Sequence, residues 1–157
     1  MFRKLICPIL FIAVSSTALA QNETAIKIRV VDGKTGAAIT PDNLQVRYKI
    51  HDSIRTAWVS QKDDGTTEFK VPEGATAISA RATYESSTSY YVNCDVAKQR
   101  KTTTESWYPL ADILSGGIKI PNECIKEKDA DKLNVEVKPG EFVLLVRKKI
   151  WLEGAQD

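Results

Sequence analysis

The feature that most constrains the fold is a repeated pattern of short alternating segments between residues 26 and 84. Apolar and polar residues alternate within each segment, and the turn sequences VDGKTG, KDDG and VPEG separate the segments. Alternation with a period of two places successive side chains on opposite faces of a β-strand, and Asp-Gly and Pro-x-Gly sequences favour tight reversals. The pattern therefore predicts half-buried strands packed as a β-sandwich.

The alternation predicts strands at 26–31, 44–50, 57–59, 67–71 and 78–84. The segment 44–50 has the cleanest pattern, with an apolar side chain at every second residue from Leu44 to Ile50. A register error of one residue would exchange the two faces, so the pattern makes a definite prediction about burial. We expect Val30, Val46, Phe69, Ile78 and Leu144 to be buried, and Lys27, Arg47, Lys49 and Lys70 to be exposed.

The second half of the chain alternates less regularly. A strand is expected at 90–96, followed by an exposed loop at 97–105 and a short helix at 109–114 that stops at Gly116-Gly117. A final hairpin is expected from 133–138 and 142–146 around Pro139-Gly140. Its second arm is apolar at every position, which is typical of a central strand covered on both faces.

The first 20 residues have the pattern of a cleavable export signal. Arg3 and Lys4 precede an apolar stretch, and Ala18-Leu19-Ala20 is a small-x-small cleavage site. The apolar stretch is shorter than the ~20 residues that a membrane span requires. We therefore expect residues 1–20 to be removed, leaving residues 21–157 as one domain without a transmembrane segment, located in the periplasm or outside the cell.

Removing Arg3 and Lys4 from the 22 basic residues leaves 20, which equals the 20 acidic residues. A mature chain of zero net charge gives no reason to expect nucleic acid or an anionic membrane as a partner.

Cys94 and Cys124 are the two cysteines that follow the expected cleavage site. In an oxidising compartment such a pair is expected to form one disulfide. A redox or metal role for free thiols is the alternative, but it would need a CxxC motif or a histidine partner.

The segments IKIRVVDGKTGAAI, KDDGTTEFKVPEG and ATAISARATY together resemble the carboxypeptidase regulatory-like domain. The resemblance covers about residues 26 to 84, with LNVEVKPGEFVLLV as a closing hairpin. It implies an all-β fold, a seven-stranded prealbumin-like (transthyretin-like) Greek-key sandwich, in a secreted bacterial protein. The segment SWYPLADILSGGIKIPNEC is not part of the family pattern, and we expect it to be an insertion with one short helix, held by the disulfide.

The candidate catalytic and metal features have simpler explanations. Prealbumin-fold 5-hydroxyisourate hydrolases use several histidines and a C-terminal Tyr-Arg-Gly-Ser, whereas this chain has His51 alone and ends in Glu-Gly-Ala-Gln-Asp. His51 with Asp52 lies where a turn is expected, and Asp63-Asp64-Gly65 with Glu68 lacks the spacing of an EF-hand. We therefore expect no catalytic residues, no metal site and no cofactor.

Aromatic residues gather around the expected disulfide region, where they form a candidate binding surface. Aromatic side chains with a polar group suit both sugar stacking and protein interfaces, and the alternative is that they cover the end of the sandwich. A second candidate is Arg147-Lys148-Lys149 followed by Ile150-Trp151-Leu152, which could dock on a partner or pack on its own domain. The residues of the first surface are Tyr84, Tyr90, Tyr91, Trp107 and Tyr108.

These observations favour a non-catalytic secreted interaction module that binds an unidentified protein or glycan of the cell envelope. The alternatives are a glycan-binding module that uses exposed tyrosine and tryptophan side chains, and a small hydrolase with an unrecognised site. The first would require exposed rings beside polar groups, and the second would require an acid-base pair converging in a pocket.

The disulfide provides the first testable prediction. Intact-mass analysis of the exported protein should show a gain of about two daltons on reduction and no thiol that reacts before it. Finding Cys94 and Cys124 free in exported protein would contradict the assignment.

Overall fold

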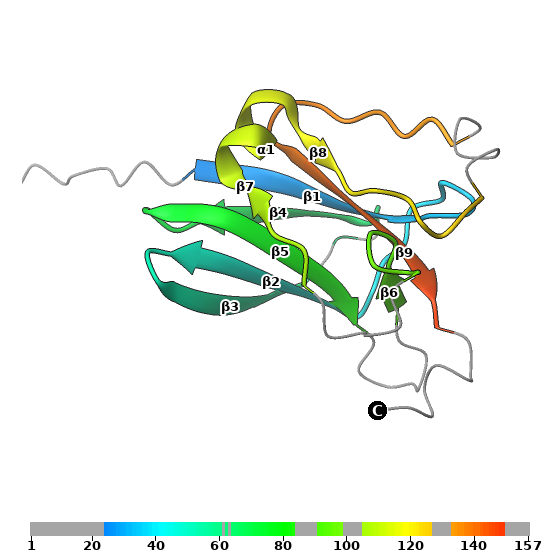
Figure 1. Ribbon diagram of the computed structural model, residues 1–157, viewed down its shortest axis with the longest axis horizontal. Coiled ribbons are helices and arrows are strands. Elements are labelled where there is room, and N and C mark those ends of the chain that lie inside the picture. The colour runs from blue at the N-terminus through cyan, green and yellow to red at the C-terminus, as the bar shows by residue number, and fades with distance from the viewer. Residues whose placement is uncertain are drawn as a thin grey trace, which may run out of the picture.

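A computed structural model describes residues 24–60, 62, 64–83, 91–98, 105–126 and 133–149. These residues form two stacked β-sheets with an apolar core between them and one short helix at the side (Figure 1). The predicted all-β sandwich is therefore confirmed. The described residues contain nine strand segments, of which two, on either side of the helix, have only two residues each.

The first sheet has the order β4-β1-β9-β6, and β8 also pairs with β9. β1 pairs antiparallel with β4 and parallel with β9, whereas β6 runs antiparallel to β9 and β8 runs parallel to it. β9 therefore occupies the centre of this sheet. The strands span β1 Thr24–Asp32, β4 Thr66–Val71, β6 Tyr91–Asn93, β8 Ile118–Lys119 and β9 Glu141–Lys148.

The second sheet is antiparallel throughout and has the order β3-β2-β5-β7. A two-residue turn, His51-Asp52, joins β2 to β3 and makes Ile50 the partner of Ser53. His51 has a φ of 51°, the left-handed conformation that such a tight turn uses. The strands span β2 Asn43–Ile50, β3 Ser53–Val59, β5 Ala75–Thr83 and β7 Tyr108–Pro109.

The predicted alternation decides which side chains form the core. All five residues expected to be buried are buried, and Lys27 and Lys70 are exposed as expected. The prediction is wrong for Arg47 and Lys49, which are half-buried because Trp107 lies against them. The buried set is Val30, Val46, Phe69, Ile78 and Leu144.

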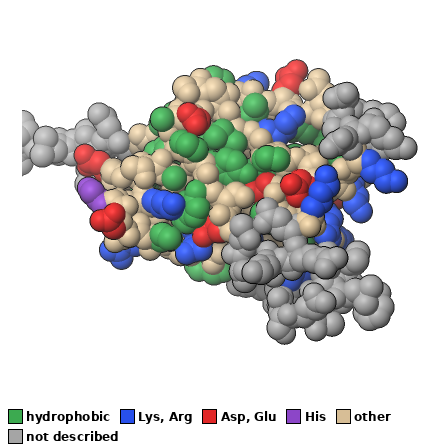
Figure 2. Space-filling view, in the orientation of Figure 1, with side chains coloured by type: hydrophobic (Ala, Val, Ile, Leu, Met, Phe, Trp, Pro, Cys, Tyr) green, Lys and Arg blue, Asp and Glu red, His purple; other side chains and the backbone are tan. Residues whose placement is uncertain are grey.

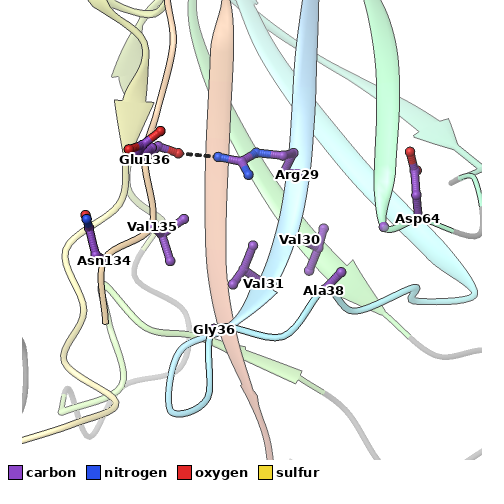
Figure 3. A pocket seen from close by; sticks show the side chains of 10 residues that line it. Arg29, Val30, Val31, Gly36, Ala38, Asp64, Asn134, Val135 and Glu136 are labelled. Carbon is purple, nitrogen blue, oxygen red and sulfur yellow. Dashed lines mark hydrogen bonds between the residues drawn. The ribbon is translucent and has the colours of Figure 1, made fainter. Parts of the chain in front are cut away.

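β9 is buried on both faces from Phe142 to Val146, as its sequence predicted. The predicted hairpin is wrong, however, because residues 133–138 do not form a strand. β8 and β6 already pair with the edge of β9 that a hairpin arm would need. The segment instead supplies Val135 to the core cluster, and Arg29 reaches across β9 to the carbonyl of Glu136 (Figure 3).

The helix α1, Leu110–Gly116, is close to its predicted position, with Pro109 before it and Gly117 after it at a φ of 75°. Only Ile113 of its apolar side chains is fully buried, and Leu114 is 37% exposed. α1 contacts β5 of one sheet and β9 of the other, so it covers one side of the sandwich (Figure 1). No helix among the described residues is long and apolar enough to cross a membrane.

The disulfide Cys94–Cys124 is present and links the residue after β6 to the segment that follows β8. The expected strand at 90–96 is shorter, because Cys94 begins a turn. The Asn122 side chain donates to the carbonyl of Gly33 at 2.8 Å, and the backbone N–H of Glu123 donates to the carbonyl of Cys94 at 2.8 Å. The insertion is thus attached directly to the end of β1.

Gly33 provides a test of this attachment. A Cβ atom at Gly33 would lie 2.4 Å from the sulfur of Cys94, so Gly33→Ala should lower the free energy of unfolding by about 1–3 kcal/mol. Gly116→Ala is the matched control, because a Cβ atom there would have no neighbour within 4 Å. Urea denaturation of both variants measures the difference. Equal stability of the two variants would contradict close packing of the disulfide on Gly33.

Candidate binding surface

The structure does not assemble the predicted aromatic residues into one exposed surface. Tyr84 and Tyr90 lie outside the described residues. Tyr91 is 3% exposed and belongs to the core, whereas Trp107 and Tyr108 are half-buried. A buried ring cannot stack on a ligand, so the prediction is wrong for Tyr91, which is a packing residue of the core.

Tyr108 acts as a half-buried hydrogen-bond donor. Its hydroxyl donates to Oδ2 of Asp95 at 2.6 Å, and its ring packs against Phe142 with centroids 5.2 Å apart. Burial, and then the hydrogen bond to Asp95, raise the pKa of the Tyr108 hydroxyl above its usual range. Tyr108 therefore stays protonated at neutral pH and joins the insertion to the turn after β6.

Asp95 and Asn93 form a small buried polar group beside this tyrosine. Asp95 is 8% exposed, and the side-chain amide of Asn93 donates to the carbonyl of Ala80 at 2.8 Å. One oxygen of each side chain, Oδ1 in both cases, is buried without a hydrogen-bond partner among the described residues. The Asn93 contact connects the two sheets, because β6 belongs to one and β5 to the other.

Trp107 lies on the outer face of the four-stranded sheet. The ammonium group of Lys49 is 4.4 Å from the centroid of its ring, and the Arg47 guanidinium is 5.9 Å away. Arg47 also forms an ion pair with Glu105. The outer face is therefore covered at this point, and Ser79, which is opposite Arg47 on β5, is only 6% exposed. Cation-π contacts of this kind contribute about 0.5–2 kcal/mol, so Trp107 anchors the insertion on the sheet.

The most exposed large apolar side chains among the described residues lie on the same outer face, on β3. Trp58 is 61% exposed and Ile54 is 47% exposed. Trp58 pairs with Gln45, and Ile54 pairs with Lys49, so both side chains point to the same side as Lys49.

We call this surface the Trp58 face. It combines exposed apolar side chains with amide and basic groups. On the side of the molecule drawn in Figure 2, hydrophobic side chains are interspersed with single charged ones over α1 and the strands below it. The sequence pattern did not predict this surface, because it placed only residues 57–59 in the third strand. The alternation of Ile54, Thr56 and Trp58 could have extended that strand. The Trp58 face consists of Ile54, Thr56 and Trp58 of β3, Gln45, Arg47 and Lys49 of β2, Ala77 and Arg81 of β5, and Trp107.

A hollow of about 360 Å³ lies between β1, the start of β4 and residues 134–136 (Figure 3). Arg29 on its wall donates to the carbonyl of Glu136 and forms an ion pair with Glu141 at 3.4 Å. Asp64 accepts hydrogen bonds from the hydroxyl of Thr66 at 2.6 Å and from its backbone N–H at 3.0 Å, which hold the pKa of the Asp64 carboxyl below its usual range. The terminal nitrogen of Arg29 and the carboxylate of Asp64 thus have partners of their own, and the two side chains do not converge on one point (Figure 3).

The described residues also contain no group of three histidine, cysteine or carboxylate side chains that could hold a metal ion. His51 is exposed in the β2–β3 turn, and Asp64 caps the turn before β4 through Thr66, as expected for turn residues. Of the second candidate surface, Ile150, Trp151 and Leu152 lie outside the described residues, and Arg147 and Lys148 end β9.

The chain matches no protein-family model, and neither the curated proteins nor the solved structures contain a detectable match to it.

Tyr108→Phe tests the structural role of the hydrogen bond between Tyr108 and Asp95. The variant leaves Asp95 without its donor, so the free energy of unfolding should fall by about 1–3 kcal/mol at neutral pH. Tyr48→Phe is the matched control, because its half-buried ring packs on Phe69 and its hydroxyl has no hydrogen bond among the described residues. We expect the control to stay within about 0.5 kcal/mol of the wild type in urea denaturation.

The raised pKa of Tyr108 adds a pH dependence with a definite sign. The tyrosine ionises near pH ~10 in the unfolded chain but at higher pH in the folded protein, so rising pH above that value favours unfolding. Stability should therefore decrease more steeply above pH ~10 in the wild type than in Tyr108→Phe. Parallel pH profiles would contradict the assignment.

Proposed function

We propose that this chain is a secreted, non-catalytic binding module that engages a macromolecular partner through the Trp58 face. The observation that carries the proposal is the exposure of Trp58, which keeps 61% of its surface in solvent on a folded strand. Exposed tryptophan beside apolar and basic side chains is typical of interface anchors, because a large rigid ring gains much contact area at a low entropic cost.

The charges around Trp58 favour a partner with acidic groups. Arg81 and Lys49 lie on the same face, whereas Glu105 is already paired with Arg47. Charged residues at the rim of an interface contribute mainly to orientation and association rate, while the central ring contributes most of the affinity. A protein with an apolar pocket bordered by carboxylates would fit this arrangement.

A carboxypeptidase regulatory-like domain in the periplasm or outside the cell would be compatible with a binding module of this kind. The mixed sheet with β1 parallel to β9, packed on an antiparallel sheet, is compatible with a prealbumin-like sandwich, a scaffold that supports many functions. The disulfide is compatible with an oxidising compartment such as the periplasm or the cell exterior.

Glycan binding is the second candidate. Trp58, Gln45 and Arg81 are successive cross-strand neighbours on three strands, which places an exposed ring beside an amide and a guanidinium group. Sugar rings stack on aromatic faces while their hydroxyls bond to such polar groups. No comparable observation favours the hydrolase, because Arg29 and Asp64 of the hollow do not converge on one point.

Trp58→Ala tests the proposed function. The side chain is exposed, so its loss should change the free energy of unfolding by less than about 0.5 kcal/mol, whereas loss of a binding anchor should weaken binding about tenfold or more. The protein should be applied to envelope extract and to a glycan array beside Leu114→Ala, a matched variant that removes another exposed apolar side chain.

We expect a ligand that binds to the wild type and to Leu114→Ala but not to Trp58→Ala. A protein ligand would support the first candidate, and a sugar on the array would support the second. Equal retention by all three proteins would overturn the assignment of the site to the Trp58 face.

A further inference from the structure

The structure points to self-association through the open edge of β3. β3 is the first strand of its sheet, and among the described residues it pairs only with β2. An open strand edge presents unpaired backbone N–H and C=O groups that can pair with another strand. Edges in monomeric proteins are usually protected by charges, bulges or proline, whereas β3 has seven residues with Arg55 as their only charged side chain.

The register of the β2–β3 hairpin determines which residues present these groups. Ile50 and Ser53 flank the two-residue turn, so they exchange backbone hydrogen bonds, and bonded pairs recur at every second residue. Ser53, Arg55, Ala57 and Val59 therefore bond to β2, and the backbone groups of Ile54, Thr56 and Trp58 point to the open edge. The opposite side of β2 agrees with this pattern, because the carbonyl of Lys49 accepts a hydrogen bond from Thr76 of β5 at 3.5 Å.

This arrangement allows full antiparallel pairing of β3 with a second copy when Thr56 lies on the two-fold axis. Thr56 then faces Thr56 of the other copy, and each Ile54 faces a Trp58. All three residues with outward backbone groups become bonded pairs. A register centred on Arg55 is excluded, because its backbone groups already bond to β2 and it would place two like charges opposite each other.

The side chains of β3 favour the same register. Ile54 and Trp58, 47% and 61% exposed, become direct cross-strand neighbours on the outer face, where an aromatic and a β-branched residue pair favourably. Arg55 faces Ala57 of the other copy. The edge thus complements itself in hydrogen bonding and apolar contact, as a two-fold interface requires, and places no like charges directly opposite each other.

We therefore infer that two copies of this chain associate through β3, in antiparallel register about Thr56, to form one continuous sheet from their two four-stranded sheets. The inference goes beyond the proposed function, because it assigns a role to the backbone edge of β3, which binding through the side chains of the Trp58 face does not use. Its consequence is a doubled Trp58 face that continues across the two-fold axis and presents two Trp58 side chains to one partner surface.

Opposite charges at residue 56 test the register. Thr56 lies on an exposed strand position, so Thr56→Lys and Thr56→Glu should both fold, and each should show at least a severalfold larger dissociation constant for self-association because like charges meet at the axis. An equimolar mixture of the two variants should recover association at low ionic strength, since only the mixed pair brings opposite charges together. Sedimentation velocity of the exported protein over a concentration series measures each case.

Backbone pairing is tested separately by Thr56→Pro, with Thr56→Val as its control. Proline removes an N–H that points to the open edge and not to β2, so the variant should fold but lose association, whereas valine keeps the N–H and should keep association. Thr56→Cys should also form a covalent dimer on oxidation, since bonded antiparallel pairs lie within disulfide range, and Arg55→Cys should not.

A wild type that stays monomeric up to its solubility limit would overturn the inference. Dimers that Thr56→Pro and the charged variants leave unchanged would also overturn it, because the association would then use another surface. In either case Trp58-dependent retention of a ligand would be unaffected, so failure of the dimer can be distinguished from failure of the proposed function.

Discussion

The parallel pairing of β9 with β1 is the contact on which the rest of the structure depends. It places β9 in the centre of its sheet, so its side chains from Phe142 to Val146 must be covered on both faces. The second sheet covers one face, and Val135 and the segment around it contribute to the other. Because the segment 133–138 has this role and β6 and β8 pair with the free edge of β9, the hairpin that its sequence suggested does not form.

The sequence predicted those parts of the fold that depend on neighbouring residues in the chain, such as alternating strands, turns and helix ends. The alternation in β1, β2, β4 and β5 identified the core correctly, because a one-residue error would have placed charged side chains between the sheets. The disulfide was predictable from two cysteines that follow an expected export signal, and α1 from a proline before it and glycine after it. The half-burial of Arg47 and Lys49 was not predictable, because it depends on Trp107, which is far away in the sequence.

The candidate site was predicted less well than the fold for the same reason. Tyr91, Trp107 and Tyr108 were selected for their chemistry, but exposure is decided by what packs against a side chain. Tyr108 has its hydroxyl on Asp95, and Tyr91 lies in the core. Trp58 was visible in the sequence only as one apolar residue of a short strand. Its importance appears once β3 is known to be an edge strand whose outer face no described segment covers.

The two sheets consequently have different roles. The central strand β9 of the first sheet is buried on both faces from Phe142 to Val146, so changes there are expected to act through stability. The antiparallel sheet contributes one face to the core, while Trp107 covers only part of the other near β2. The region of β3 that is left open contains the exposed ring and the unpaired backbone edge together. Binding and self-association are therefore expected at the same strand, because it is the strand among those described whose side chains and backbone are least used by the fold.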